Sequence, residues 1–310
     1  MKRDTLTGNL ACFAAYALFG FNIISCKRIA LDGNITPMAL FCLRSFGAAV
    51  LFWLWSLFSA PREHIAKADV WKVALASFLG LFMTQITFLF AITQTTAIDA
   101  SIMATLSPVM TLVISAIFIK ERITWSGVAG IILSIAGVLI LVFNSVSISS
   151  GADHTTVWGI LGMIANCLCF ASYVGIFKPL IQRYSVVTFM KWMFLFSSLM
   201  ALPFSFSAFG ASDLAAVPPD VMGHVAFVVV GATFIAYFLI PYGQKRLRPV
   251  MVCMYTYVQP VIAMVIALAM GLDTLSPLKI AACLLVFLGV GLVNFIPRQT
   301  KIPDSNEKSL

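Results

Sequence analysis

Arg44 is the residue of this chain best suited to bind a charged solute. It lies seven residues after Pro37 in a long apolar segment, about 10 Å along a helix at 1.5 Å per residue. A charge at such a depth in a membrane is costly and by default indicates a function. Its guanidinium suits a carboxylate, which it binds through two hydrogen bonds. The alternatives are a side chain that reaches the membrane surface, or one that bonds backbone carbonyls.

Other polar side chains also fall inside apolar segments, where amides and phenols normally face the interior of a helix bundle. Hydrogen bonding between helices and the lining of a cavity explain them equally well. Tyr255 and Tyr257 cannot both face one cavity, because two positions differ by about 200° around a helix. We choose Tyr255, which lies four residues before Gln259 on the same face. The predicted substrate-binding residues are Asn22, Arg44, Gln85, Asn166, Tyr173, Tyr237, Tyr255 and Gln259.

The sequence has no pattern typical of catalysis or of metal binding. The three histidines fall in loops or at a helix end, with no acid at helical spacing within an apolar segment. The seven cysteines form no CxxC pair, and we interpret them as small buried residues. No phosphate-binding glycine loop indicates an ATP site. We therefore predict no enzyme activity, no metal and no cofactor, with a membrane-embedded enzyme or an assembly protein as the alternatives.

The elements that carry these residues are membrane-spanning helices. The chain is 61% hydrophobic and 10% charged, whereas a soluble domain carries about 25% charged residues. Ten apolar segments are long enough to cross a bilayer as helices. The net charge of +8 is spread between them, which favours a membrane surface over nucleic acid as the partner. The segments lie near 8–26, 36–58, 71–93, 98–119, 125–143, 158–177, 187–207, 222–243, 249–270 and 276–296.

The distribution of lysine and arginine predicts the direction of these helices. With the N-terminus in the cytoplasm, most of the 20 basic residues fall on the cytoplasmic side, and loops 144–157 and 208–221 contain none. We therefore predict a multi-pass protein of a bacterial-type inner membrane with both termini in the cytoplasm. We also predict that it works as a monomer. Asp99 is the acid that falls near a span, and we predict that it is a solvated residue at the start of its helix.

One passage of the sequence occurs twice. "SPVMTLVISAIFIKERIT" begins at Ser107 and "QPVIAMVIALAMGLDTLS" at Gln259, which is 152 positions later (259 − 107). Pro108 and Pro260 each free a backbone carbonyl within an apolar helix, so we predict a kink or hinge at both. Glu121 and Asp273 follow these helices, and we predict that they are structural loop acids that stabilise the start of the next helix.

The starts of the two halves also agree, "GNLACFAAYALFGFNIISCK" (8–27) with "GILGMIANCLCFASYVGIFK" (159–178). A unit of five helices is odd, so its second copy must enter the membrane from the opposite side. We predict an all-α integral membrane protein of ten transmembrane helices arranged as two inverted five-helix repeats. The repeats are residues 1–145 and 156–297, followed by a cytoplasmic tail, 298–310. Inverted repeats are the usual construction of secondary transporters.

The sequence resembles the EamA-type permeases of the drug/metabolite transporter superfamily over residues 8–297. The resemblance rests on "FGFN" (19–22) with Lys27, on "TPMALFCLR" (36–44), and on the two proline-containing passages. The family often has Trp where this chain has Phe19 and Phe170, and Glu where it has Asp273. The resemblance implies secondary transport of small metabolites through a cavity between the halves, commonly export of amino acids or related amphipathic compounds. Alternative solutes are drug-like, nucleobase or sugar-related compounds. The mode of transport is proton antiport, facilitated diffusion or exchange.

Overall fold

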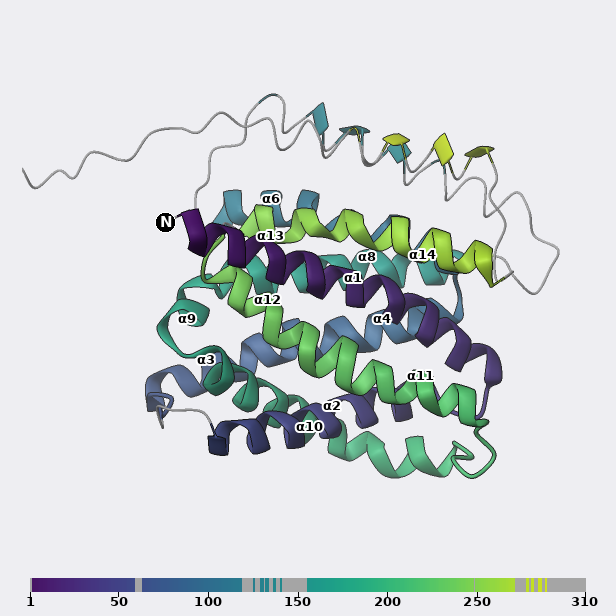
Figure 1. The fold of residues 1–310 in the computed structure, drawn as a ribbon, viewed down its shortest axis with the longest axis horizontal. Helices are drawn as coiled ribbons and strands as arrows, with labels where there is room; N and C mark the ends of the chain where they lie inside the picture. The colour runs from purple at the N-terminus through teal and green to yellow at the C-terminus, as the bar shows by residue number, and fades with distance from the viewer. Residues whose placement is uncertain are drawn as a thin grey trace, which may run out of the picture.

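The protein is an antiparallel bundle of long helices, seen in a computed structural model (Figure 1). The structure describes residues 2–58, 63–118, 155–247 and 249–270, together with scattered residues between 125 and 140 and between 277 and 288. The first half contains α1 (Lys2–Asp32), α2 (Pro37–Phe58), α3 (Lys67–Ser77), η1 (Phe78–Met83), α4 (Thr84–Thr93), α5 (Ala97–Ala104) and α6 (Ser107–Phe118). The second contains α8 (Val157–Ile176), α9 (Lys178–Arg183), α10 (Val186–Gly210), α11 (Pro219–Val229), η2 (Val230–Ile235), α12 (Ala236–Gln244), α13 (Pro249–Met254), η3 (Tyr255–Tyr257) and α14 (Val258–Ala269).

Seven of the predicted spans appear as helices long and apolar enough to cross a membrane, within the part of the chain that the structure describes. The predicted span 249–270 is described as α13, η3 and α14 in series. The predicted spans 125–143 and 276–296 lie largely outside the described residues. Large apolar side chains such as Phe58 and Phe206, each 89% exposed, cover the outside of the bundle and suit contact with lipid.

The two halves of the chain run in opposite directions. α1 begins beside the end of α12, where a Cβ on Gly8 would lie 3.0 Å from Arg246 Cβ. α8 begins at the other end of the bundle, where the Thr156 backbone N–H donates to the Gln94 carbonyl at 2.9 Å. We call the end that contains the start of α8 the Lys27 end. The opposite end, which contains the start of α1, we call the Lys178 end.

Matching contacts confirm the inverted repeat. At the Lys27 end, Lys27 Nζ donates to the Thr95 carbonyl at 2.8 Å, and at the Lys178 end Lys178 Nζ donates to the Leu247 carbonyl at 2.8 Å. Thr95 and Leu247 are 152 positions apart (247 − 95), and the two lysines are aligned in the repeats. The same bond therefore forms once in each half, at opposite ends of the bundle.

The axis that relates the halves passes between α2 and α10. Ser45 Oγ and Ser197 Oγ lie 3.1 Å apart, and these residues are 152 positions apart. A residue can touch its own repeat mate only where the two-fold axis passes. α2 and α10 pack closely along their lengths, low in the view of Figure 1.

Within the described residues each half contains one π-helical turn, η1 in the first half and η2 in the second. The two turns are one repeat apart, because adding 152 to 78 and 83 gives 230 and 235. Directly after η1 the Thr84 hydroxyl donates to the Leu79 carbonyl at 2.6 Å, and within η2 the Thr233 hydroxyl donates to the Val228 carbonyl at 2.7 Å, so both bonds reach back five residues. Turns of this kind interrupt the regular helical bonding and are frequent at functional sites. Both lie halfway along their helices.

Two clusters of buried apolar side chains hold the bundle together, one toward each end. The cluster at the Lys27 end includes Ile29, Ile98 and Val221. The cluster at the Lys178 end includes Val73 and Leu180. Buried polar side chains such as Arg44 and Gln85 lie between these clusters.

Candidate functional site

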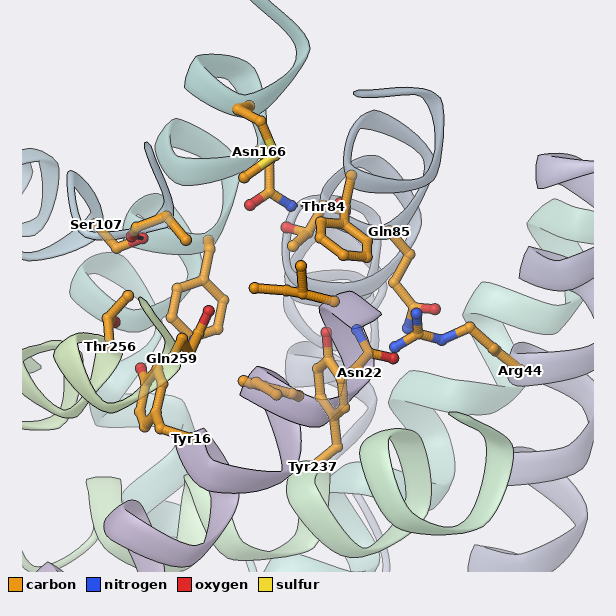
Figure 2. A pocket seen from close by; sticks show the side chains of 16 residues that line it. Tyr16, Asn22, Arg44, Thr84, Gln85, Ser107, Asn166, Tyr237, Thr256 and Gln259 are labelled. Carbon is orange, nitrogen blue, oxygen red and sulfur yellow. Dashed lines mark hydrogen bonds between the residues drawn. The ribbon is translucent and has the colours of Figure 1, made fainter. Parts of the chain in front are cut away.

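A cavity of about 80 Å³ lies between the two apolar clusters, and both halves of the chain line it. Ligand pockets usually measure about 300–1,000 Å³, so in this conformation the cavity is too small for a metabolite. The lining residues are Tyr16, Phe19, Asn22, Ile23, Arg44, Thr84, Gln85, Phe88, Ala104, Ser107, Met163, Asn166, Phe170, Tyr237, Thr256 and Gln259 (Figure 2).

Arg44 supplies the charge of this cavity and is only 2% exposed. Its Nε–H donates to Thr233 Oγ1 at 2.9 Å, and its Nη1 faces Cys26 Sγ at 3.9 Å. Both partners are uncharged. Among the residues that the structure describes, no carboxylate forms a salt bridge with Arg44. A guanidinium has five N–H donors, so these two contacts leave others available.

The π-helical turn η2 explains why Arg44 points into the cavity. The Thr233 hydroxyl donates its proton to the Val228 carbonyl. Its oxygen is therefore the acceptor in the hydrogen bond from Arg44. The turn therefore fixes the acceptor that orients the guanidinium. In Figure 2 the guanidinium points toward the side of the cavity formed by Asn22 and Gln85.

Several polar atoms that face the cavity have no hydrogen-bond partner. They are both amide atoms of Gln85, the Tyr16 hydroxyl and the Thr256 hydroxyl. The Tyr237 hydroxyl faces the Gln85 amide, and Tyr16 faces Thr256, but neither pair has hydrogen-bond geometry. Buried polar atoms are nearly always paired, because leaving one unpaired costs about 1–3 kcal/mol. These atoms are therefore available to a bound molecule.

The structure brings together six of the eight residues predicted to bind substrate: Asn22, Arg44, Gln85, Asn166, Tyr237 and Gln259. Asn166 also holds α8 against α4, since its Nδ2 donates to the Thr84 carbonyl at 2.6 Å. Both explanations offered by the sequence, cavity lining and helix-to-helix bonding, therefore apply to Asn166.

The other two predicted residues do not line the cavity. Tyr173 is buried against η1, where a Cβ on Gly80 would come within 2.5 Å of the Tyr173 ring. Tyr255 was chosen on α-helical spacing, but Tyr255–Tyr257 form a 3₁₀ turn. Residues three apart share a face in that geometry. Thr256, three residues before Gln259, therefore takes the place predicted for Tyr255.

Sequence reasoning missed further lining residues, among them Tyr16, Ser107 and Thr256. Tyr16 precedes Phe19 by three residues and Asn22 by six, a spacing that keeps all three on one helical face. That signal was available. Ser107 lies in the passage that contains Pro108, but nothing in its type distinguished it.

The prolines predicted as hinges each follow an interruption of their helix. α5 ends at Ala104, and Pro108 is the second residue of α6. α14 directly follows η3, and Pro260 is its third residue. Glu121 and Asp273, the predicted loop acids, lie outside the described residues.

Asp99 differs from its predicted solvated position. It lies in the first turn of α5, as predicted, but it is buried, and the Thr155 hydroxyl donates to its Oδ2 at 2.5 Å. Thr155, two residues before α8, lies against the start of α5, where its hydroxyl also accepts from the Thr96 backbone N–H at 3.1 Å. The part of the chain that the structure describes contains no group of three His, Cys, Asp or Glu residues that could hold a metal ion.

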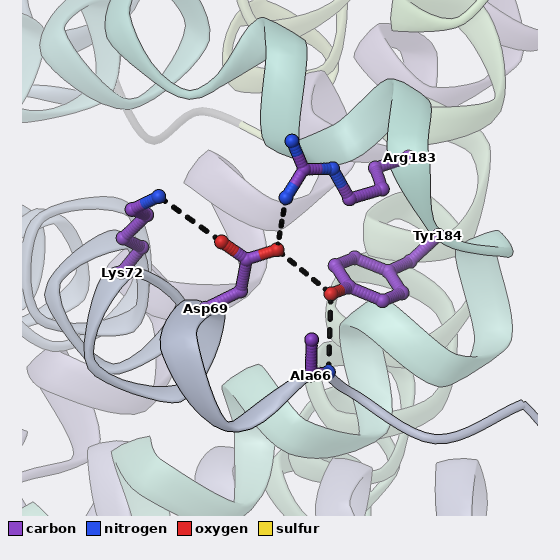
Figure 3. Close-up of polar contacts among 5 residues, drawn as sticks. All are labelled: Ala66, Asp69, Lys72, Arg183 and Tyr184. Atoms are coloured by element: carbon purple, nitrogen blue, oxygen red, sulfur yellow. Dashed lines mark hydrogen bonds and ion pairs between the residues drawn. The ribbon is translucent and has the colours of Figure 1, made fainter.

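A network of charged residues joins the two halves at the Lys178 end (Figure 3). Asp69 is 1% exposed; its Oδ1 accepts from Lys72 Nζ at 3.1 Å, and its Oδ2 accepts from the Tyr184 hydroxyl at 2.8 Å and from Arg183. The Ala66 backbone N–H donates to the Tyr184 oxygen at 3.2 Å. The hydrogen bond to Asp69 raises the pKa of Arg183 above its ordinary value, so this cation stays charged.

An ion pair also joins the two halves at the Lys27 end. Arg28, near the end of α1, forms a salt bridge of 2.9 Å with Asp220 at the start of α11. At the Lys178 end the ion pair likewise joins a helix start in one half, Asp69 in α3, to an arginine of the other half, Arg183 in α9. These residues are not the repeat mates of Asp220 and Arg28. The Arg28–Asp220 pair is more open, with side chains 37% and 56% exposed, and it lacks a buried carboxylate such as Asp69.

An all-helical bundle with inverted repeats and a polar cavity between them is the construction of a membrane carrier. Residues 6–143 and 157–295 each match the EamA-like transporter family. The chain belongs to this family, which confirms the resemblance predicted from the sequence and places it within the drug/metabolite transporter superfamily.

Curated relatives cover most of the chain at low identity. An uncharacterized transporter of Archaeoglobus fulgidus is 24% identical over 84% of this chain and 89% of its own length. An uncharacterized transporter of Bacillus subtilis is 25% identical over 82% and 76%. A protein of Streptantibioticus cattleyicolor named "Probable terminal-alkyne amino-acid exporter" is 24% identical over 73% of both chains. A crystal structure of another protein shares the fold with a TM-score of 0.66 and 18% identity, covering 95% of this chain and 97% of that one.

Proposed function

We propose that this protein is a secondary transporter that exports small amphipathic metabolites, amino acids or related compounds, by alternating access. The observation that carries the proposal is the mid-bundle cavity, which both repeats line and in which buried polar atoms lack partners. A site at the interface of inverted repeats is the expected place for a transported solute. The relative named as an amino-acid exporter supports this solute class.

The two ends of the bundle act as gates in this proposal. With both termini in the cytoplasm of a bacterial-type cell, the Lys178 end faces inward and the Lys27 end faces outward. The Asp69 network closes the inner side, and the Arg28–Asp220 pair closes the outer side. Each half of the cycle breaks one set of contacts while the other holds. Pro108 and Pro260 lie next to helix interruptions and serve as the hinges.

The units that move in this proposal are the two repeats, residues 1–145 and 156–297, with 298–310 as a cytoplasmic tail. The apolar clusters lie on both sides of the cavity, so the described conformation is a closed intermediate between the inward-open and outward-open forms. One chain contains both repeats and both gates, and we therefore propose that it works as a monomer and catalyses no reaction.

Transport by the purified protein tests this proposal. Liposomes that contain the protein are given pooled radiolabelled amino acids and related carboxylates, with and without an imposed pH gradient, and protein-free liposomes serve as the control. We expect uptake above the control for at least one pool, and a gradient dependence would show coupling to protons. Uptake equal to the control for every pool in both conditions would refute the proposed solute class.

A further inference from the structure

No carboxylate in the described part of the chain balances the charge of the cavity. Arg44 contacts a neutral hydroxyl and a thiol, and no described carboxylate pairs with it. A buried charge without a partner is costly, and proteins normally pair it or neutralise it. Arg44 stays charged because a guanidinium does not lose its proton in proteins. The cavity is therefore cationic when it is empty, and a bound anion would complete it.

The remaining lining residues are uncharged. Of the 16 that line the cavity, none is Asp or Glu, and the polar ones besides Arg44 are amides, hydroxyls and phenols. These groups donate and accept neutral hydrogen bonds. An ammonium in this cavity would lose its hydration and be repelled by Arg44, and no carboxylate among the described lining residues would compensate for either cost. Aromatic faces attract cations only weakly by comparison.

The polar residues form two groups on opposite sides of the cavity. Figure 2 shows Arg44, Asn22, Gln85 and Tyr237 on one side and Tyr16, Thr256, Ser107 and Gln259 on the other. The rings of Phe19, Phe88 and Phe170 line the cavity as well. The first group can take an anion through the guanidinium and the unpaired Gln85 amide. The second group can bond a neutral hydroxyl or amide through the unpaired Tyr16 and Thr256 hydroxyls.

We propose, on the basis of the transport function above, that this site selects monocarboxylates whose remaining groups are uncharged over zwitterions of the same skeleton. The carboxylate binds Arg44, and the uncharged polar and apolar parts occupy the opposite side. A 2-hydroxy acid, a 2-oxo acid or an N-acylated amino acid has this charge pattern. The free amino acid carries an extra ammonium for which the cavity offers no counter-charge.

Matched ligands on the unmodified protein provide the test. L-lactate, L-alanine and L-alaninamide share one skeleton, as do L-phenyllactate, L-phenylalanine and L-phenylalaninamide. Binding is measured at pH 7 as the ligand-dependent rise in apparent Tm of the protein in detergent micelles, and as competition against uptake of a labelled solute into liposomes. We expect each hydroxy acid to bind about tenfold or more tightly than its amino acid, and the amides to show no binding.

Variants locate the effect at Arg44. Arg44→Gln keeps a donor for Thr233 but removes the charge, and it should abolish the advantage of the hydroxy acids. Arg44→Lys keeps the charge but not the planar fork, and it should retain part of the advantage. Lys191→Gln removes a cation that lies over Trp53, away from the cavity, and it should behave like the unmodified protein.

The outcomes separate this inference from the proposed function. Amino acids that bind as tightly as the hydroxy acids, or more tightly, would overturn the charge preference and leave the transport function standing. Failure of every carboxylate to bind while the protein transports another solute would also overturn the charge preference and leave transport standing. Failure of every ligand to bind, together with no uptake of any solute, would overturn both.

Discussion

Replacing Thr233 by valine should destabilise the empty protein, because this hydroxyl links the buried Arg44 to the π-helical turn. Threonine and valine have nearly the same shape, so the change removes the hydroxyl and little else. Two hydrogen bonds are lost, from Arg44 Nε at 2.9 Å and to the Val228 carbonyl at 2.7 Å. Bonds to charged groups contribute about 1.5–3 kcal/mol and neutral bonds about 0.5–1.5 kcal/mol. The expected loss is about 2–4.5 kcal/mol in the free energy of unfolding.

A threonine beside the other π-helical turn provides a control for this prediction. Thr84 makes a similar bond directly after η1, reaching back five residues to the Leu79 carbonyl at 2.6 Å, but among the described residues no arginine donates to its hydroxyl. Thr84→Val should therefore lose only about 0.5–1.5 kcal/mol. Thr233→Ser keeps the hydroxyl and should lie near the unmodified protein.

The measurement is equilibrium unfolding of the three variants in detergent micelles, followed by circular dichroism. The difference between Thr233→Val and Thr84→Val isolates the bond to Arg44. Equal destabilisation by the two valine substitutions would refute the reasoning, since it would mean that the guanidinium gains nothing from Thr233. A loss of carboxylate binding in Thr233→Val that Thr233→Ser does not share would show that the bond also orients Arg44.

Two further substitutions test the packing and the gates. Gly80→Ala should cost about 1–3 kcal/mol in unfolding experiments, because its Cβ would lie 2.5 Å from the Tyr173 ring, whereas a Cβ on Gly223 meets nothing within 4 Å and Gly223→Ala serves as the control. A loss no greater than that of the control would contradict the packing of α8 against η1. Asp69→Asn removes the ion pairs of the Lys178 end, so cavity residues should become more accessible to cytoplasmic reagents, whereas Asp220→Asn should raise access from the opposite face. Equal effects of the two on both faces would argue against separate gates.

The general architecture could be predicted from the sequence, since it depends on features that repeat along the chain. Apolar length indicates the spans, and the matched passages around Pro108 and Pro260 indicate the inverted repeat. Residues such as Arg44 and Gln85 were predicted to bind substrate because a polar side chain within a span is costly to expose to lipid and therefore normally faces the interior of the bundle. Their positions in the cavity agree with that reasoning.

The features that the sequence could not predict depend on local backbone geometry or on distant contacts. The 3₁₀ turn at Tyr255–Tyr257 rotates the helix face and exchanges Tyr255 for Thr256, and no residue there marks a change of helix type. The partners of Asp69 include Arg183 and Tyr184, which are 114 and 115 positions away in the chain. Only the three-dimensional packing of α3 against α9 brings them together.

Alternating access is the central claim, and the accessibility of one cavity residue tests it most directly. Ser107 lines the cavity between the two gates. A single cysteine at that position, in a protein from which the native cysteines have been removed, should therefore be labelled whenever either gate opens. Membrane-impermeant thiol reagents are applied to oriented vesicles from one face and then from the other, with and without substrate. We predict labelling from both faces, and protection by substrate on both. Labelling from one face only, or labelling that substrate does not affect, would contradict a single site exposed in turn to the two sides of the membrane.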